Sequence, residues 1–285
     1  MDIRFLESLI AVVETGSIAG AARLQYLTAA AVSQRIQALE KDLDCELLSR
    51  SGHAAKPTET CLNLMPRARK LVREAEALKG DIDDSAITGT LRIGAISTAL
   101  TGLLPLVLRR LLKAAPKVVP QITPGTSKTL FDALLSGTLD AGILVEPPFA
   151  LPKSLTQQNI RREPLLLLSK GTHDRSLHQI LSTEPYICYD SNSWGGRVAE
   201  RYLADNRLFP VTLCELDALE AIQILVEEEL GVSLVPYWSG LQPEKNQLTV
   251  HLIEDERYLR RIVLITATLP QQPNIINKFK ECLFL

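Results

Sequence analysis

Residues 17–43, SIAGAARLQYLTAAAVSQRIQALEKDL, decide the fold of the N-terminal part of this chain. The second half of the stretch carries apolar residues at steps of four, three and four: Val32, Ile36, Leu39 and Leu43. At about 100° per residue these positions share one helical face, which predicts a buried stripe. The first half is a run of small residues, which let a second helix cross closely. Ser17 and Thr28 are good N-cap residues, so we predict two helices joined by a short turn, the outline of a helix-turn-helix.

The opposite face of the second helix is polar. It presents Ala30, Gln34, Gln37 and Lys41, with Ser33 at its flank. Uncharged polar side chains near the start of a helix suit a major groove, where Gln and Ser bond base edges. This face is a candidate surface for reading duplex DNA, and an ordinary solvated face is the alternative. The candidate contacts are Thr28, Ser33, Gln34 and Gln37, with Arg35 at the phosphate backbone.

Flanking segments complete this first unit. Residues 3–15 carry apolar residues at helical spacing and stop at Gly16, which predicts a first amphipathic helix. Residues 46–57 hold turn residues between two short runs, which fits a two-stranded wing. The wing carries Arg50, His53 and Lys56. Cationic side chains in a wing are expected to contact DNA phosphates. A histidine is mostly uncharged near neutral pH, so the alternative interpretation is that His53 makes no functional contact.

A long helix is predicted next, from a cap at Thr58 to about Asp84. Its apolar residues alternate steps of three and four: Cys61, Leu64, Ala68, Leu71, Ala75, Leu78 and Ile82. A seam of this length indicates a coiled-coil partner, and Pro66 should bend the helix or remove one backbone bond. We therefore expect a homodimer formed through Leu64, Leu71, Leu78 and Ile82. Packing within one chain is the alternative.

The second part of the chain has a different pattern. Its 285 residues exceed the usual size of one domain, and the pattern changes near Thr88-Gly89. From there, strands at 91–95, 118–123, 141–145, 164–168, 186–189, 211–216, 232–235 and 261–267 alternate with helical segments. This alternation is typical of a parallel α/β sheet. We predict a DNA-binding domain at 1–58, a linker helix at 59–88 and an α/β domain at 89–285.

Composition excludes several classes. A net charge of −2 gives no global attraction to nucleic acid, so any DNA affinity must come from local Arg and Lys. The five cysteines are scattered, without the close pairs that bind zinc or the density of a disulfide scaffold. We expect no metal ion and no cofactor. We also see no secretory signal and no apolar run of membrane length, which predicts a cytoplasmic, soluble protein without a membrane partner.

Several short runs carry a resemblance to a known family. They are Ala21-Ala22, Thr28, Ala31-Val32-Ser33, Leu39-Glu40, Leu47-Leu48 with Arg50, Pro57-Thr58-Glu59, Leu91-Arg92-Ile93-Gly94, Leu139-Asp140-Ala141-Gly142 and Gly231-Val232-Ser233-Leu234-Val235-Pro236. In order and spacing they resemble the LysR-type transcriptional regulators over nearly the whole chain. Two departures stand in the DNA-reading part. Ala29-Ala30 replaces a Gln followed by Pro or Ser, and Gln25 replaces a Leu.

The resemblance implies a specific architecture: a winged helix-turn-helix, a dimerising linker helix and a two-lobed effector domain like the type 2 periplasmic binding proteins. It also implies homotetramers built from homodimers. Within the α/β domain we place lobe I at about 89–162 and 267–285, and lobe II at about 163–266.

Ligands of two-lobed α/β domains bind outside the carboxyl ends of strands, where helix N-termini present free backbone N–H groups. Three such corners hold hydroxyl side chains, which together with helix dipoles favour an anion. With neighbouring candidates, the predicted effector contacts are Ser97, Thr98, Thr126, Ser127, Glu146, Asn192, Ser193 and Trp194. Trp194 can stack on a ligand, and Glu146 can meet a ligand amine. The alternatives are plain helix caps, a core tryptophan and a solvated glutamate.

We infer a sequence-specific DNA-binding regulator whose small-molecule effector bears a carboxylate, such as an amino or organic acid. A Rossmann-type enzyme is a rival, but no Gly-x-Gly-x-x-Gly follows any strand. A solute-binding protein is a second rival, and it predicts a signal peptide and no helix-turn-helix. Redox sensing by Cys188 and Cys214 is a third, although no cluster of bases flanks either thiol.

Overall fold

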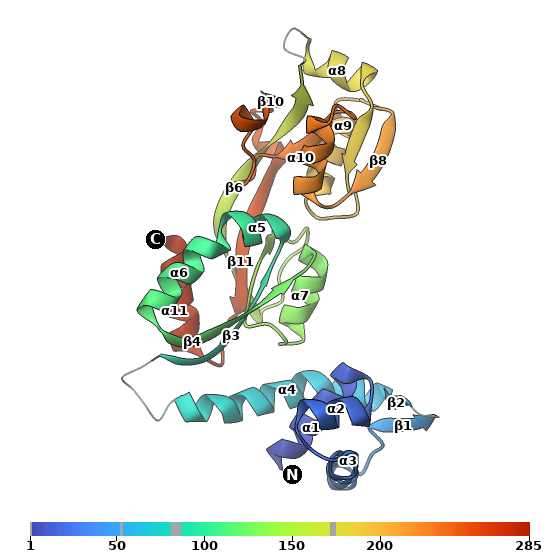
Figure 1. Cartoon of the computed structure of the whole chain (residues 1–285), viewed down its shortest axis with the longest axis vertical. Coiled ribbons are helices and arrows are strands. Elements are labelled where there is room, and N and C mark those ends of the chain that lie inside the picture. Colours follow the sequence, from blue (N-terminus) through green and yellow to red (C-terminus); the bar gives the residue numbers. More distant parts are fainter. Residues whose placement is uncertain (1, 52–53, 81–86, 172–174) are drawn as a thin grey trace. The chain divides into compact units, whose positions relative to one another are not determined.

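A computed structural model describes residues 2–51, 54–80, 87–171 and 175–285. The side chains of residues 50, 51, 54 and 76–80 lie outside this description. The chain divides into two compact units near residue 89. Figure 1 shows the elements of each unit in chain order, and each unit is described by itself below.

The first unit is built from four helices and a hairpin. They are α1 (Ile3–Thr15), α2 (Ile18–Leu24), α3 (Ala29–Leu43), β1 (Leu48–Ser51), β2 (Ala54–Pro57) and α4 (Glu59–Gly80). The predicted N-caps are present. The Ser17 side chain accepts the Gly20 N–H, and the Thr28 side chain accepts the Ala31 N–H. Gly16 ends α1 with φ +71°, a left-handed conformation that favours glycine.

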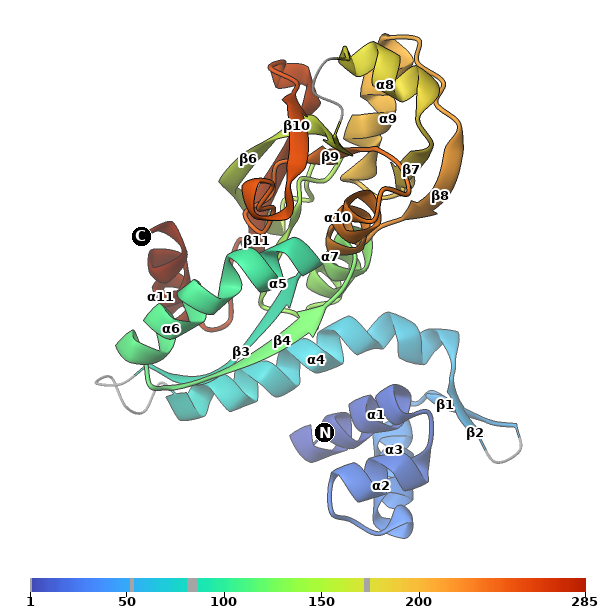
Figure 2. The same ribbon diagram turned by 45° about the horizontal axis from the view of Figure 1, so that its top comes forward.

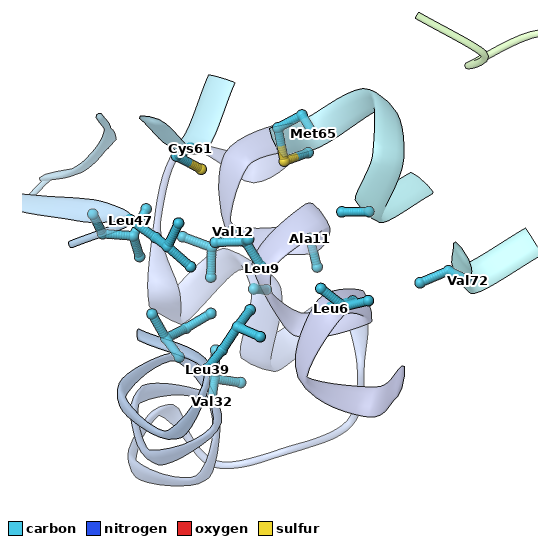
Figure 3. Packing of buried hydrophobic residues seen from close by; sticks show 14 of the residues in the cluster. Leu6, Leu9, Ala11, Val12, Val32, Leu39, Leu47, Cys61, Met65 and Val72 are labelled. Carbon is cyan, nitrogen blue, oxygen red and sulfur yellow. The ribbon is translucent and has the colours of Figure 1, made fainter. Parts of the chain in front are cut away.

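One hydrophobic core holds this unit together (Figure 3). Leu9 and Val12 of α1 pack with Val32 and Leu39 of α3, and all four are almost fully buried. The predicted stripe of α3 is therefore correct except at its end, since Leu43 is 39% exposed. The chain turns away after Leu43, because Asp44 adopts a left-handed conformation that ends the helix.

The first half of the predicted seam of α4 packs within its own unit. The residues of α4 that enter the core of its own unit are Cys61, Met65, Ala68 and Val72. Leu64 packs beside that core, whereas Leu71 is 40% exposed. Three of the predicted seam positions, Cys61, Leu64 and Ala68, thus pack within the chain, because a three-four pattern does not say which partner covers it. Helix α4 is described to Gly80, so Ile82 and the Leu78 side chain lie outside the described residues.

The second unit begins with lobe I, an α/β layer. Its elements are β3 (Thr88–Ala95), α5 (Ser97–Gly102), α6 (Leu104–Ala114), β4 (Lys117–Pro124), α7 (Ser127–Leu135), β5 (Ala141–Val145), β11 (Leu259–Ala267) and α11 (Pro273–Phe284). Helices α6 and α11 pack against each other, and α7 packs on β5 (Figure 2). The sequence pattern predicts a single helix near residues 99–114. Two are present, because Pro105 has no N–H to continue α5 and instead occupies the first turn of α6.

Lobe II carries α8 (Leu177–Thr183), β7 (Tyr186–Tyr189), α9 (Gly196–Asp205), β8 (Thr212–Leu216), α10 (Leu219–Glu227), β9 (Ser233–Pro236) and β10 (Leu248–Leu252), with 3-10 turns at Glu244–Asn246 and Glu256–Tyr258. Buried side chains of β6, β7 and β9 form its core, among them Leu166, Leu168, Ile187 and Val235. Helix α8 and strand β10 were not predicted.

Strand β6 (Leu155–Lys170) belongs to both lobes. Its first part, up to Pro164, pairs with β11, and its second part, from Leu165, pairs with β9 and β10. All of these pairings are antiparallel, whereas β3–β5 and β7–β8 are parallel. The expected all-parallel sheet is therefore a mixed one. Since β11 pairs with β5 and with the lobe I part of β6, the chain returns to lobe I near Leu259 and not near residue 267.

No single helix in the described part of the chain has the length and hydropathy of a membrane span. Helices α1 and α2 reach that length and composition only as a pair, which bends by 117° between them.

Candidate functional site

The polar face of α3 stands out on the first unit. Gln34 and Gln37 are exposed, as are Ala30 and Lys41, and Ser33 is half-buried at the flank. The predicted arrangement of this helix is therefore present. Thr28 is exposed and uses its hydroxyl to cap the helix, accepting the Ala31 N–H at 3.1 Å. The face offers amide and hydroxyl groups from the first turns of one helix, which is the chemistry that reads base edges.

Arg35 is held by a buried network that the sequence did not predict. Its Nη1 donates to the Ser8 hydroxyl at 3.1 Å, and that hydroxyl donates to Gln25 Oε1 at 2.8 Å. Ser8 is fully buried. The departure at Gln25 thus has a structural role, because its amide oxygen accepts a hydroxyl that would otherwise lack an acceptor. Arg35 is half-buried, so part of the residue remains in contact with water.

The wing forms as predicted, as a two-stranded antiparallel hairpin with Ser49 opposite Lys56 and Arg50 opposite Ala55. Lys56 is exposed. The side chain of Arg50 and the whole of His53 lie outside the described residues.

A cleft of about 450 Å³ lies between the two lobes of the second unit. Seven of the eight predicted effector residues line it: Ser97, Thr98, Thr126, Ser127, Asn192, Ser193 and Trp194. They come from the starts of α5, α7 and α9. The three predicted helix starts therefore meet at one cleft, as expected. The lining also includes Lys128, Tyr189, Asp190, Asp217 and Arg260, none of which was predicted.

Glu146 is the exception, because it is not among the residues that line the cleft. Its carboxylate accepts from Arg261 Nη1 at 3.2 Å and from Gln157 Nε2 at 2.9 Å. Both partners lie on the adjoining strands β11 and β6. The strand end directs this carboxylate toward neighbouring strands and away from the cleft, which corrects the predicted role.

On the lobe I wall, two hydroxyls have well-defined bonding. Ser127 is 8% exposed, and its Oγ accepts the Val145 N–H at 3.1 Å. Thr98 is 5% exposed, and its Oγ1 accepts from Arg260 Nη2 at 3.2 Å. A hydroxyl has one proton and two lone pairs. Because each oxygen already accepts an internal donor, each proton remains available to a ligand acceptor.

Arg260 lies at the base of the cleft. It is 2% exposed and stands on β11 directly opposite Glu163 of β6. Its Nε and Nη2 lie 2.7 Å and 2.6 Å from Glu163 Oε2, and its Nη1 donates to the Tyr189 hydroxyl at 3.3 Å. Burial raises the pKa of the Glu163 carboxyl, and the nearby Arg260 charge opposes that rise. With Thr98 on one lobe and Tyr189 on the other, the guanidinium bonds to both lobes.

The signal that could have revealed Arg260 is weak. It begins the run Arg260-Arg261 ahead of Ile262, where an alternating strand puts one arginine on each face of the sheet. Burial of one of them depends on Glu163, which is 97 residues away in sequence.

The lobe II wall carries carboxylates. Asp190 is half-buried and accepts the Asn192 N–H at 2.9 Å. Asp217 is exposed to the cleft and is hydrogen-bonded to the Ser193 side chain. Loss of surrounding water raises the pKa of Asp217, the Ser193 bond opposes that rise, and the like charge of Asp190 adds to it.

Trp194 connects the lobes by aromatic contacts. Its ring centroid lies 5.8 Å from that of Phe131 on α7 and 5.6 Å from that of Phe149 after β5. Phe131 and Phe149 are themselves 5.2 Å apart, and all three pairs meet edge to face. Edge-to-face pairs are worth roughly 0.5–1.5 kcal/mol beyond the area they bury. Trp194 is therefore both a lining residue and part of an interlobe cluster.

The Cys188 thiol of lobe II lies in surroundings that disfavour the thiolate. Burial and the acidic groups around it, with Glu215 first, raise the pKa of Cys188 to about 11. Reactive thiols have lowered pKa values, so the structure gives no support to redox sensing there. Within the described residues, no three His, Cys, Asp or Glu side chains are placed to hold a metal ion.

The combination of a winged helix-turn-helix and a two-lobed domain with a polar interlobe cleft defines a class: transcription regulators that carry their own ligand-binding domain. Two family models match the chain. One, described as bacterial regulatory helix-turn-helix protein, lysR family, covers residues 3–62, and the other, LysR substrate binding domain, covers residues 85–284. The chain belongs to the LysR family of transcriptional regulators, which are DNA-binding proteins and not enzymes.

Relatives and solved structures agree with this assignment. The HTH-type transcriptional regulator ClcR of Pseudomonas putida is 28% identical over 252 residues, which is 83% of each chain. The regulator GltR of Bacillus subtilis is 28% identical over 261 residues, 90% of this chain and 87% of GltR. Full-length OxyR from Pseudomonas aeruginosa has a similar fold, with a TM-score of 0.77, 20% identity and coverage of 100% and 95%. Full-length CbnR in complex with its target DNA gives a TM-score of 0.66 at 22% identity, with 99% of each chain covered.

Proposed function

We propose that this LysR-type regulator senses a small molecule that bears a carboxylate and binds in the interlobe cleft. The observation that carries the proposal is the bonding of Ser127 and Thr98, whose oxygens accept internal donors and whose protons remain for a ligand. The start of α7 adds free backbone N–H groups and the positive end of a helix dipole. Such donors favour a carboxylate oxygen.

The effector residues of this proposal are Ser97, Thr98, Thr126 and Ser127 on lobe I, with Asn192, Ser193 and Trp194 on lobe II. A charge-assisted hydrogen bond has a net value of about 1.5–3 kcal/mol. Removing one should cost roughly tenfold or more in affinity, at about 1.4 kcal/mol per decade.

Calorimetric titration of the full-length chain with small carboxylates and amino acids tests this. Ser97→Ala and Ser127→Ala should each weaken the ligand that binds by tenfold or more. Ser154→Ala, an exposed serine before β6, is the matched control and should leave the affinity unchanged. Equal affinity in the wild type and both cleft variants would place the site elsewhere.

We also propose that the polar face of α3 and the wing form the DNA contact surface. Thr28, Ser33, Gln34 and Gln37 would meet bases, and Arg35, Arg50, His53 and Lys56 would meet phosphates. The exposure of Gln34, Gln37 and Lys56 supports this assignment. CbnR, which has the same fold, has been solved bound to its target DNA.

Fluorescence anisotropy with a duplex selected from a random pool tests the surface. Gln34→Ala should lower discrimination at one base pair by about 1–3 kcal/mol, as expected for a lost base contact. Lys56→Ala should make the dependence of log affinity on log salt shallower by about 0.9, at any sequence. Lys153→Ala, an exposed lysine in the second unit, is the control. Wild-type discrimination in the Gln34 variant would remove α3 from the base-reading role.

Finally, we propose self-association through one flank of α4. Leu64 and Leu71 lie seven residues apart and therefore share this flank, and Leu71 is 40% exposed, which favours an apolar partner. Light scattering of the full chain should give at least a dimer, with tetramers as the family resemblance implies. Leu71→Asp should shift the equilibrium toward smaller species, and an unchanged distribution would exclude Leu71 from the interface.

A further inference from the structure

The charged side chains on the two walls of the interlobe cleft have opposite signs. Lobe I offers donors: the free protons of Thr98 and Ser127, the backbone at the start of α7, and the exposed ammonium of Lys128. Lobe II offers acceptors, because Asp190 and Asp217 both line the cleft. Each has a single hydrogen-bonded neighbour described above, and an ionised carboxylate accepts several more bonds.

The charges of the lining do not suit a simple anion. Arg260 is the most buried cation, but Glu163 lies 2.6 Å from it and balances its charge. That leaves Lys128 on one wall against Asp190 and Asp217 on the other, so the remaining charge of the lining is negative. A monocarboxylate would gain from the lobe I donors and be repelled by lobe II. An effector that also carries a cation would gain from both walls.

We propose that the effector is zwitterionic, with its carboxylate against the hydroxyls and helix start of lobe I and an ammonium group against Asp190 and Asp217 of lobe II. This inference rests on the proposed sensing function and names the chemical class of the ligand for the same cleft. An α-amino acid is the simplest member of that class. The volume of about 450 Å³ falls in the usual range of small-molecule sites, about 300–1,000 Å³.

This arrangement also explains how a bound zwitterion would favour closure of the two lobes. Donors on lobe I and acceptors on lobe II bind opposite ends of one molecule, so a zwitterion draws the two walls together. A ligand that carries one charge finds a charged partner on one wall only. The ammonium group is therefore the part of the effector that would bind the carboxylates of lobe II.

Calorimetry on the full-length chain with matched probes tests the inference. The first set is the standard L-amino acids. The second is the corresponding acids without the amino group: propionate, succinate, glutarate, 4-methylpentanoate and 3-phenylpropionate. The third is the corresponding amines, such as ethylamine and phenethylamine. At least one amino acid should bind, and its matched acid and amine should each bind at least tenfold more weakly.

Two variants then assign the ammonium. Asp217→Asn and Asp190→Asn should each weaken the bound amino acid at least tenfold, while the matched acid binds as well as before or better. An asparagine at 190 keeps an oxygen that accepts the Asn192 N–H, so the local turn is preserved. Asp132→Asn is the control, since Asp132 is an exposed aspartate of α7 that does not line the cleft.

The pH dependence gives a second readout. The groups that face the Asp217 carboxyl are Ser193, Asp190 and Arg260, and its pKa is raised in the free protein. An ammonium ligand favours the ionised form. Amino-acid affinity should therefore fall as the pH drops through that raised pKa, and Asp217→Asn should remove this decline.

The outcomes separate the two proposals. An acid that binds as tightly as its amino acid overturns the zwitterion inference but leaves the sensing function standing, provided Ser127→Ala weakens it. Unchanged amino-acid affinity in both aspartate variants also overturns the inference alone. If no probe of the three sets binds, both proposals fail.

Discussion

Arg35 and Arg260 show two ways of holding an arginine in one chain. Arg260 is buried, bonds to Glu163 through two nitrogens and also reaches Thr98 and Tyr189. Arg35 is half-buried, bonds to the Ser8 hydroxyl and has no ion-pair partner within the described residues. A paired and desolvated charge fixes structure, whereas an unpaired and hydrated one is free to meet a phosphate. Burial and pairing, more than residue type, set what each arginine contributes.

The largest effect expected from this comparison is at the buried pair. Glu163→Gln removes one charge and leaves Arg260 buried without a counter-ion, which typically costs about 3–5 kcal/mol. Urea unfolding followed by circular dichroism measures the loss. The control is Glu184→Gln, because Glu184 and Arg175 form a 2.7 Å pair at 33% and 40% exposure, where about 0–1 kcal/mol is expected. Equal losses in the two variants would contradict the role of burial.

The next effect concerns the buried hydroxyl under Arg35. Ser8→Ala removes the group that bonds both Gln25 and Arg35, so the free energy of unfolding should fall by about 1–3 kcal/mol. Restoring an apolar partner in the double variant Ser8→Ala with Gln25→Leu should recover part of that loss, because no polar atom of Gln25 is then left unsatisfied. The same unfolding assay measures both. A double variant less stable than the single one would show that Gln25 has another buried partner.

Arg35→Ala separates folding from DNA binding. Only one hydrogen bond, from the half-buried guanidinium to the Ser8 hydroxyl, is lost from the fold, so the unfolding free energy should fall by about 0.5–1.5 kcal/mol. The dependence of log DNA affinity on log salt should become shallower by about 0.9, because one phosphate contact is lost. A salt dependence identical to that of the wild type would assign Arg35 to structure alone.

The smallest effect is expected at a fully exposed arginine. Arg4 bonds the Asp2 carboxylate, and that hydrogen bonding lowers the pKa of Asp2 from 3.8 to about 2. A lowered pKa means that Asp2 stabilises the fold above pH 3.8 and loses this contribution as the pH falls toward 2. The stability difference between wild type and Asp2→Asn should therefore be constant from pH 7 to about pH 4.5 and shrink below it. A difference that varies near neutrality would point to a different titrating group.

Much of the fold could be predicted from the sequence, because local signals determine it. The caps at Ser17 and Thr28, the stripe of α3, the wing and most strands of the second unit follow from patterns a few residues long. The predictions that failed concern elements whose position depends on partners far away in the sequence. The direction of strand β11 depends on its neighbours, and the facing of α4 depends on α1, which packs against it. The spacing of apolar residues along the chain identifies neither partner.

The residues of the cleft also divide into those that local sequence patterns could predict and those that they could not. Hydroxyls at helix starts could be recognised because capping chemistry is local, and seven of eight candidates line the cleft. The charged residues could not be placed. Asp217, Lys128 and Arg260 are ordinary surface-like residues in sequence, and they converge only because three separate segments meet. Glu146 illustrates the opposite error, since a plausible carboxylate turned out to be bound by Arg261.

Strand β6 has a consequence for how the two lobes move. The strand exchanges β11 for β9 and β10 between Pro164 and Leu165, and a proline has no N–H to give to a ladder. The ribbon of chain that joins the lobes therefore has its weakest bonding at the residue where its neighbours change. We expect any rotation of one lobe against the other to take place there and at the second connection, near Leu259. A ligand that contacts both walls would therefore act on a hinge of two short segments, one between Pro164 and Leu165 and the other near Leu259.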